Sequence, residues 1–417
     1  MRFEDYRISP GIKQAIGKLG WKRPTDIQFK AIPHVLKGED VLAIAQTGTG
    51  KTAAFAIPVL HMLDLKKQRH RPDGIKCVVM EPTRELAIQI TRVFEQIGKH
   101  TGVKTFCVFG GVEQGPQIEK LEKGIDILVA TPGRLFDLTA QGHIRLDRVE
   151  ILILDEADHM LDLGFYDDIQ QLIRKLPRNR QTLFFSATID EKIKKLAYSL
   201  TKKPIRISLS PKDPVSKNVD HAVAHIEMDD KRFFLEKLAK EYKDDKILVF
   251  VRTQVRAERV IKAMERVGIE AVALHGGKEQ KLRLESLRKF KQNEIKMMVA
   301  TDVSARGIDI PNVQYVINYD LPDVAENYVH RVGRTGRGTA RGKAISFASD
   351  REHELLQKIE EYVSYKISVM EVDKNTYQHV VETSEENESD WKSLIKEHND
   401  YLADPKKRKK KKRGKKK

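Results

Sequence analysis

A glycine-rich segment directly after an apolar run contains the residue types that bind phosphate. Residues 45–52 read Ala-Gln-Thr-Gly-Thr-Gly-Lys-Thr and follow the apolar residues 41–44. A strand that opens into such a turn points several backbone N–H groups at one spot, and the positive end of the next helix dipole adds to their attraction for phosphate. Lys51 is placed to reach the β- and γ-phosphates, and the Thr52 hydroxyl is placed to ligate Mg²⁺. The general pattern has glycine first, where this chain has Ala45.

Acidic residues follow a second apolar run. Residues 155–158 read Asp-Glu-Ala-Asp after the apolar residues 151–154. A carboxylate at the end of a buried strand, here Asp155, is where a second protein contact to the metal is expected. Its neighbour Glu156 is then free to orient or deprotonate the attacking water. Either motif alone is often an ordinary loop, but both at strand ends predict a nucleotide-hydrolysing site.

These motifs need strands that end at one edge of a sheet. Short β-branched runs alternate with helical segments such as 84–98 and 190–200, which predicts a parallel sheet covered by helices. The expected strands are 41–45, 77–80, 105–109, 127–130, 151–155, 182–187 and 205–208. The alternation breaks at a Pro-containing segment and then restarts. The second set is 222–228, 247–251, 270–275, 296–301, 315–319 and 344–349.

Two α/β domains in tandem are therefore expected. We place the nucleotide-binding domain at 1–208, a linker at 209–219, the second domain at 220–370 and a C-terminal extension at 371–417. The apolar period fades beyond about residue 370. From Glu382 onward we expect a disordered or loosely helical segment, because it lacks a helical apolar stripe.

The second domain carries an arginine-rich loop but no P-loop. Residues 330–337 read His-Arg-Val-Gly-Arg-Thr-Gly-Arg. If the domains face each other, Arg334 and Arg337 reach the γ-phosphate as arginine fingers, which supply about 10³–10⁵ in rate; the alternative is a loop that contacts nucleic acid. Asp302 and Asp309 either bind ribose hydroxyls or pair with arginines.

Composition favours a soluble, intracellular protein that binds a polyanion. The two cysteines, Cys77 and Cys107, form no CxxC pair, so a zinc site is not expected, and no apolar run is long enough to span a membrane. We expect a cytoplasmic location. The net charge is +16, of which residues 406–417 hold 11 positive charges; residues 382–404 carry −6, which leaves +11 on residues 1–381. The alternative for the basic tail is a solubilising role.

The ordered set of motifs resembles the DEAD-box RNA helicase family across roughly residues 1–370, and more loosely its bacterial RhlE-type subgroup. The matching segments are 20–21 with 24–28, 45–52, 82–87, 110–111, 131–134, 155–158, 186–188, 249–251, Gln280 with Arg283, 300–302 with 305–309, and 330–337. The family's fold is two RecA-like domains, each a mainly parallel sheet flanked by helices. Asp26 stands where the family has proline, a departure that leaves the proposed chemistry untouched.

The resemblance implies roles for individual residues around ATP and Mg²⁺. Gln28 would recognise the adenine edge, with Trp21 stacked on the base and Phe3 supporting the pocket. The implied contacts to ATP also include Thr47, Gly48, Thr49, Gly50, Lys51, Thr52, Gly307, Asp309, Arg334 and Arg337. Asp158, Ser186, Thr188 and His330 would couple hydrolysis to RNA handling, with Ser186 and Thr188 bonded to Asp158.

The resemblance also implies an RNA path on both domains. Its residues are Pro82, Thr83, Arg84, Gly110, Gly111, Thr131, Pro132, Gly133, Arg134, Arg252, Thr253, Gln280, Arg283, Thr301 and Asp302. Contacts to phosphates position a strand without recognising its sequence, and contacts to 2′-hydroxyls distinguish RNA from DNA. We therefore expect binding to single strands and short duplexes, with added affinity from the tail 406–417.

The function expected is that of an ATP-dependent RNA helicase, in which ATP is hydrolysed only after RNA binding has closed the two domains. Two other classes stay open. One is an ATP-gated RNA clamp that rarely unwinds, since clamping and unwinding use the same residues. The other is a P-loop ATPase acting on DNA or protein. Nothing in the sequence requires an oligomer, so a monomer is expected, and protein partners cannot be identified.

Overall fold

The computed structural model describes residues 1–46, 48–69, 74–209, 215, 218–306, 308, 310–336, 340–372 and 374–384. The chain divides into two compact units, each built on one sheet of seven strands. The first unit comprises Met1–Lys217 with the short segments Lys278–Leu284 and Val303–Pro311, and the second comprises the rest. Within the described part of the chain, no helix combines the length and the apolar character needed to cross a membrane.

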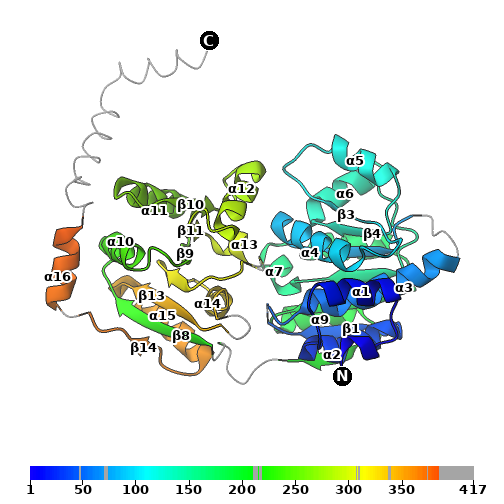
Figure 1. Ribbon diagram of the computed structural model, residues 1–417, viewed down its shortest axis with the longest axis horizontal. Helices are drawn as coiled ribbons and strands as arrows, with labels where there is room; N and C mark the ends of the chain where they lie inside the picture. The colour runs from blue at the N-terminus through cyan, green and yellow to red at the C-terminus, as the bar shows by residue number, and fades with distance from the viewer. Residues whose placement is uncertain are drawn as a thin grey trace, which may run out of the picture. The chain divides into compact units, whose positions relative to one another are not determined.

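The first sheet is parallel throughout, with the strand order β3-β4-β2-β5-β6-β1-β7. Figure 1 labels β1, β3 and β4 of this sheet. Its strands are β1 (Val41–Ile44), β2 (Cys77–Met80), β3 (Thr105–Val108), β4 (Ile127–Ala130), β5 (Ile151–Leu154), β6 (Gln181–Ser186) and β7 (Ile205–Ser208). Parallel strands need crossover connections. In this sheet, at least one helix lies between each pair of strands that follow one another along the chain. The predicted strands of this domain agree with the observed ones to within one residue.

Helices cover both faces of the first sheet. They are α1 (Pro10–Lys18), α2 (Asp26–Leu36), α3 (Lys51–Arg69), α4 (Arg84–Ile97), α5 (Gly115–Glu122), α6 (Pro132–Ala140), α7 (Ala157–Asp162), α8 (Tyr166–Lys175) and α9 (Glu191–Leu200), after the short 3-10 helix η1 (Phe3–Asp5). Val41 and Ala43 join the core under α1 to α4, whereas Leu42 and Ile44 join the core under α5 to α9. Successive strand residues point to opposite faces, so a strand covered on both sides is apolar throughout.

The second sheet is also parallel, with the order β10-β11-β9-β12-β13-β8-β14. Its strands are β8 (Val219–His225), β9 (Ile247–Phe250), β10 (Ala271–Leu274), β11 (Met297–Ala300), β12 (Tyr315–Asn318), β13 (Gly342–Ala348) and β14 (Ser368–Val369). The helices that follow β8 along the chain are α10 (Lys231–Glu241), α11 (Gln254–Arg266), α12 (Gln280–Lys291), α13 (Asp302–Ala305), α14 (Ala325–Val332), α15 (His353–Val363) and α16 (Lys374–Thr383), with the 3-10 helix η2 (Asp350–Glu352). Two sheets of this kind confirm the predicted pair of RecA-like domains.

Three details of the second unit differ from the expectations. The strand expected at 222–228 begins three residues earlier, at Val219, because its whole length pairs with β13. The two-residue strand β14 was not predicted, since two residues carry no alternating pattern. The helix α16 forms where the apolar period fades, because the Tyr377 ring packs on Phe234 with ring centres 5.0 Å apart. The expected disordered or loosely helical character of 385–417 concerns residues outside the described ones.

Candidate ATP and RNA sites

The glycine-rich segment 45–52 connects β1 to α3, so its backbone lies at the carboxyl edge of the first sheet. Gly48 and Gly50 have φ of +81° and +93°, a conformation that glycine adopts without strain. Gly50 also lies close to Gln28: a Cβ on Gly50 would approach the Gln28 Nε2 to 2.4 Å. The Thr49 hydroxyl donates to the Gln46 carbonyl at 2.8 Å and thereby holds the turn. This loop begins at the predicted position.

Lys51 and Glu156 form a buried ion pair between the two motifs. The Lys51 Nζ lies 2.9 Å from the Glu156 Oε1, and the two side chains are 5% and 6% exposed. Burial by itself lowers the pKa of Lys51, but the nearby carboxylates of Glu156, Asp155 and Asp158 outweigh it and raise this pKa above its ordinary value. Lys51 therefore stays charged, which suits its predicted role in binding phosphate.

Two further carboxyl groups, those of Asp155 and Glu81, lie around this ion pair. Asp155 follows β5 and is buried; burial raises its pKa to about 7, Lys51 opposes the rise and the charge of Glu156 adds to it. Glu81 follows β2 and is fully buried; burial, Asp155 and Glu156 together raise its pKa well above the ordinary value. Glu156 has a φ of +49°, a left-handed conformation that costs a non-glycine residue roughly 1–3 kcal/mol. Backbone strain of this kind is concentrated at functional sites.

The donor atoms in this region suit a hard cation. Asp155 offers carboxylate oxygens and Thr52, on the first turn of α3, carries a hydroxyl. No group of three His, Cys, Asp or Glu within the described ranges has the geometry to hold a metal by itself. Mg²⁺ is usually bound through one or two carboxylates, several waters and substrate phosphates, so these residues fit Mg²⁺ that arrives with a nucleotide.

The residues expected around the base lie next to the P-loop. The Gln28 side chain is buried, its Nε2 donates to the Gly50 carbonyl at 3.1 Å, and its Oε1 accepts from the Thr25 backbone N–H at 2.9 Å. A side-chain amide has two N–H donors and two acceptor lone pairs, so these two bonds leave one of each for the predicted contact with adenine, as far as the described residues show. Trp21 is 37% exposed, and the buried Phe3 donates its backbone N–H to the carbonyl of Lys22 at 3.3 Å.

Asp158 connects the acidic motif to the segment after β6. Its carboxylate accepts from the backbone N–H groups of Ala187 and Thr188, both at 3.2 Å, and from the Thr188 hydroxyl at 3.3 Å. The expected bond between Ser186 and Asp158 is not formed: within the described residues the buried Ser186 hydroxyl has no hydrogen-bond partner. Ser186 is the last residue of β6, and it is the two residues after it that reach Asp158.

The RNA-binding candidates of the first unit gather at the carboxyl ends of three adjacent strands. Segments 82–84, 110–111 and 131–134 come directly or closely after β2, β3 and β4, which are neighbours in the sheet. Gly111 lies against Arg84, since a Cβ there would approach the Arg84 guanidinium to 2.1 Å, and Gly110 is nearby. Thr83 caps α4 by accepting from the Leu86 N–H at 3.4 Å. The Arg134 Nη2 donates to the Val112 carbonyl at 2.9 Å.

Several of these residues begin a helix. Thr131 and Pro132 are the N-cap and first residue of α6, and Gly133 follows them. Proline at the first helical position has no N–H of its own, so it adds no donor that would lack an intrahelical partner. The backbone N–H groups of such helix starts point at the edge where a nucleic acid phosphate would bind.

In the second unit Asp302 pairs with an arginine, one of the two roles left open above. Its carboxylate accepts from the Arg331 Nε at 2.5 Å and from the Nη2 at 2.7 Å, a bidentate pair. Arg252 contacts Asp323 at 3.2 Å, and Thr253 caps α11 by accepting from the Arg256 N–H at 3.1 Å. Thr301 lies directly after β11. Gln280 and Arg283 lie in the first turn of α12, within the segment Lys278–Leu284 that belongs to the first unit.

The arginine-rich loop is described only in part. His330 lies on α14, and its carbonyl accepts from the Nε of the buried Arg334 at 3.0 Å. Arg337, Gly307, Asp309 and Thr47 lie outside the described residues. Their predicted contacts to ATP therefore stay predictions.

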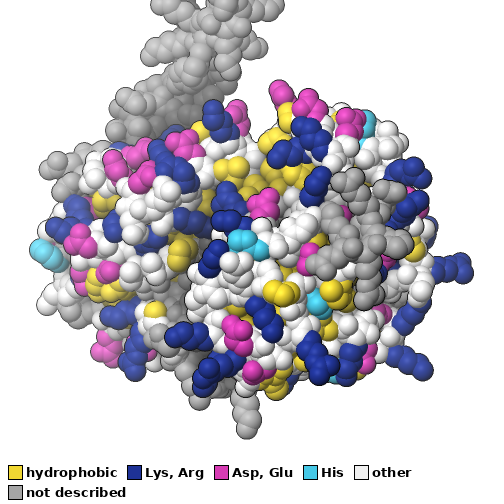
Figure 2. All heavy atoms as spheres, turned by 45° about the vertical axis from the view of Figure 1, so that its right-hand side comes forward, with side chains coloured by type: hydrophobic (Ala, Val, Ile, Leu, Met, Phe, Trp, Pro, Cys, Tyr) yellow, Lys and Arg dark blue, Asp and Glu magenta, His cyan; other side chains and the backbone are white. Residues whose placement is uncertain are grey.

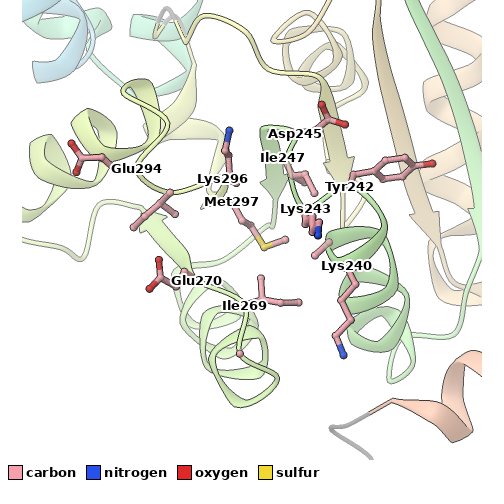
Figure 3. Close-up of a pocket in the computed structure, with 13 residues that line it drawn as sticks. Lys240, Tyr242, Lys243, Asp245, Ile247, Ile269, Glu270, Glu294, Lys296 and Met297 are labelled. Carbon is pink, nitrogen blue, oxygen red and sulfur yellow. The ribbon is translucent and has the colours of Figure 1, made fainter.

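A cavity of about 480 Å³ in the second unit contains none of the predicted site residues (Figure 3). It is lined by Tyr242, Ile247, Ile269 and Met297 among others, and Ile247 and Met297 are the first residues of β9 and β11. The cavity is thus at the amino edge of the second sheet. Ligands of parallel α/β sheets bind at the carboxyl edge, so the cavity is separate from the proposed chemistry.

Charged side chains of both signs lie on the face of the molecule that Figure 2 shows. Figure 2 shows Lys and Arg side chains spread over the visible face and interspersed with Asp and Glu. A distributed positive excess attracts a polyanion without selecting a sequence.

Comparisons with known proteins identify the family. Residues 25–196 match the DEAD/DEAH box helicase model, and residues 230–339 match the helicase conserved C-terminal domain. The chain is 39% identical over 378 residues to an ATP-dependent RNA helicase RhlB from Shewanella amazonensis, covering 90% of this chain and 86% of the relative. It is 38% identical over 375 residues to the DEAD-box ATP-dependent RNA helicase RhpA from Helicobacter pylori, covering 89% and 74%.

A solved structure has the same fold. Dbp5 of S. cerevisiae bound to RNA and ADP BeF3 is 28% identical, with a TM-score of 0.80 over 91% of this chain and 98% of that one. The finer resemblance to the RhlE-type subgroup stays a prediction, because the relatives named here carry other names. With the P-loop, the acidic motif and the second RecA-like sheet all in the expected order, the chain belongs to the DEAD-box family of ATP-dependent RNA helicases.

Proposed function

We propose that this helicase hydrolyses Mg²⁺-bound ATP at the carboxyl edge of its first sheet. Lys51 binds the β- and γ-phosphates, Thr52 and Asp155 hold Mg²⁺, and Glu156 positions or deprotonates the attacking water. Gln28 recognises the base, Trp21 stacks on it, and Phe3 supports that pocket. The bound cation would neutralise charge that develops on the phosphates.

The observation that carries this proposal is the buried Lys51–Glu156 ion pair, at 2.9 Å. It joins the phosphate-binding loop to the residue assigned to the water. When the γ-phosphate binds, Lys51 turns to the phosphate oxygens, and Glu156 loses its cationic partner. Its carboxylate is then released to accept a proton from water, so ATP binding itself prepares the base.

The proposed RNA path follows the edge formed by the ends of β2, β3 and β4. Backbone N–H groups at the starts of α4 and α6, with Arg84 and Arg134, contact phosphates. Further contacts come from Arg252, Thr253, Gln280 and Arg283. We propose that RNA and ATP bring the two domains together. Arg334 and Arg337 then complete the ATP site as arginine fingers.

Unwinding is proposed to be local. A strand held in a bent path cannot remain in a regular duplex, and unstacking costs a few kcal/mol for each step. Closure therefore separates only a short duplex, or remodels an RNA–protein complex. The Asp158–Thr188 bonds tie the acidic motif to the end of β6 and would transmit closure between the two sites.

Glu156→Gln tests the assigned base. The variant keeps the size of the side chain but cannot accept a proton, so it should bind ATP and RNA and stop turnover. Glu150→Gln is a matched control, because Glu150 directly precedes the same strand β5 at its other end. If Glu156→Gln hydrolyses ATP at the wild-type rate while the control is normal, the assignment of Glu156 fails.

An ATP-gated RNA clamp is the alternative. The two functions differ in turnover: displacement of a strand by substoichiometric protein supports the helicase mode, and stable RNA retention without displacement supports the clamp. We further propose that the chain acts as a monomer and that residues 406–417 add RNA affinity. Removal of these residues should then flatten the salt dependence of RNA binding.

A further inference from the structure

Glu81 lies at the same edge of the sheet as the proposed metal ligand. It directly follows β2, and β2 is the neighbour of β5 with Met80 paired to Leu154. The next residues in this register are Glu81 and Asp155. Neighbouring strands lie about 4.8 Å apart, so Glu81 and Asp155 lie side by side, each directly after the end of its strand.

The Glu81 side chain is buried without a partner. It is 0% exposed, and within the described residues neither carboxylate oxygen has a hydrogen-bond partner. Its backbone N–H donates to the Ala130 carbonyl at 3.0 Å, which fixes the main chain. Burial of a polar group without a hydrogen bond costs free energy, and both oxygens of Glu81 bear that cost.

The groups around Glu81 are those of the phosphate and metal site. The charges of Asp155, Glu156 and Lys51 act on it, but Lys51 is already paired with Glu156. Asp155 and Glu156 repel a third carboxylate. A divalent cation beside Asp155 would replace this repulsion of the Glu81 carboxylate by an attraction. It would also supply the interaction partner that the Glu81 oxygens lack.

We infer that Glu81 is a positioning residue of the Mg²⁺ site, whose carboxylate accepts hydrogen bonds from water molecules in the shell of the cation held by Asp155. The inference rests on the proposed function. A water-mediated contact is favoured because no three acidic side chains in the described residues have metal-holding geometry, and because Mg²⁺ retains several waters. Residues that support a metal in this way orient its ligands and typically contribute about 10–100-fold in affinity.

The test measures metal affinity without catalysis. Binding of a fluorescent ADP analogue is titrated with Mg²⁺ for the wild type, Glu81→Gln and Glu81→Ala. Both variants should need about 10–100-fold more Mg²⁺ for half of the metal-dependent gain in ADP affinity. Affinity for ADP without metal should stay within a few-fold of the wild type, since Glu81 contacts no nucleotide atom in this account.

Asp126→Asn is the matched control, because Asp126 is also a buried carboxyl residue but directly precedes β4, at the opposite edge of the same sheet. Asp155→Asn is the positive control and should lose most of the Mg²⁺ dependence. Thermal unfolding gives a second readout: without metal both Glu81 variants should melt no lower than the wild type, and Mg²⁺ with ADP should raise their melting temperature less.

Three outcomes decide the inference. Weaker Mg²⁺ dependence in both Glu81 variants, with a normal Asp126→Asn, supports it. Wild-type Mg²⁺ dependence in either Glu81 variant overturns it and leaves the proposed metal site standing, provided that Asp155→Asn is impaired. A wild type that binds ADP equally with and without Mg²⁺ overturns both the metal site and the role of Glu81.

Discussion

Replacement of Lys51 by methionine should destabilise the first domain as well as abolish phosphate binding. Methionine removes the charge that neutralises Glu156, whose side chain is only 6% exposed. Loss of one partner from a buried ion pair costs about 3–5 kcal/mol, because the remaining charge stays buried and uncompensated. Addition of Glu156→Gln to Lys51→Met removes that charge, so the double variant should recover about 1–3 kcal/mol of the loss. Its ATPase activity should not recover.

Urea unfolding followed by tryptophan fluorescence can measure this in the first domain alone. The chain has two tryptophans, Trp21 and Trp391, so a Trp391→Phe background leaves a single reporter in the first unit. The four proteins of the double-mutant cycle are compared in that background. A Lys51→Met cost below about 1 kcal/mol, or strictly additive effects of the two substitutions, would refute the assignment of Lys51–Glu156 as a coupled buried pair.

Three further predictions concern the other parts of the protein. Arg334→Ala should lower RNA-stimulated turnover by about 10³-fold or more with ATP affinity within a few-fold, and single-turnover hydrolysis beside nucleotide binding will measure both. Gln28→Ala should reduce the preference for ATP over other nucleoside triphosphates; unchanged preference in competition binding would contradict its role. Glu352 is paired at 2.5 Å with the fully buried Lys231; burial raises its pKa, but Lys231 and Ser349 outweigh this and lower it below the usual 4.5. The Glu352 carboxylate therefore contributes to the free energy of unfolding above pH 4.5, and this contribution is lost as the pH falls through the pKa of Glu352 in the folded protein. Glu352→Gln should lower the free energy of unfolding by about 3–5 kcal/mol near pH 7. In urea titrations at decreasing pH, the variant should lose less stability than the wild type.

Buried parallel strands were predictable because each is a short apolar run that precedes a polar turn. The runs before Ala45 and Asp155 are strands β1 and β5, and the motifs follow them directly. A strand covered on both faces has no polar side, which makes its run easy to recognise. The start of β8 at Val219 was less predictable, since pairing with β13 rather than its own composition sets it.

Residues of the site were harder to assign where their role depends on neighbours distant in sequence. Glu81 and Asp155 both directly follow an apolar run, a signal that was available in the sequence, but only the pairing of β2 with β5 places them together. No sequence pattern predicted the left-handed φ of Glu156, because glutamate rarely adopts this conformation. The Asp302–Arg331 pair likewise needs the fold, which brings α13 to α14.

The most direct test of the account is ATP hydrolysis by the intact chain with no nucleic acid, with single-stranded RNA, and with single-stranded DNA of the same sequence. The account predicts strong stimulation by RNA, little by DNA, and none of it in Glu156→Gln. Equal rates under all three conditions would mean that the ATP site is complete without RNA, and would contradict the proposed RNA-gated mechanism.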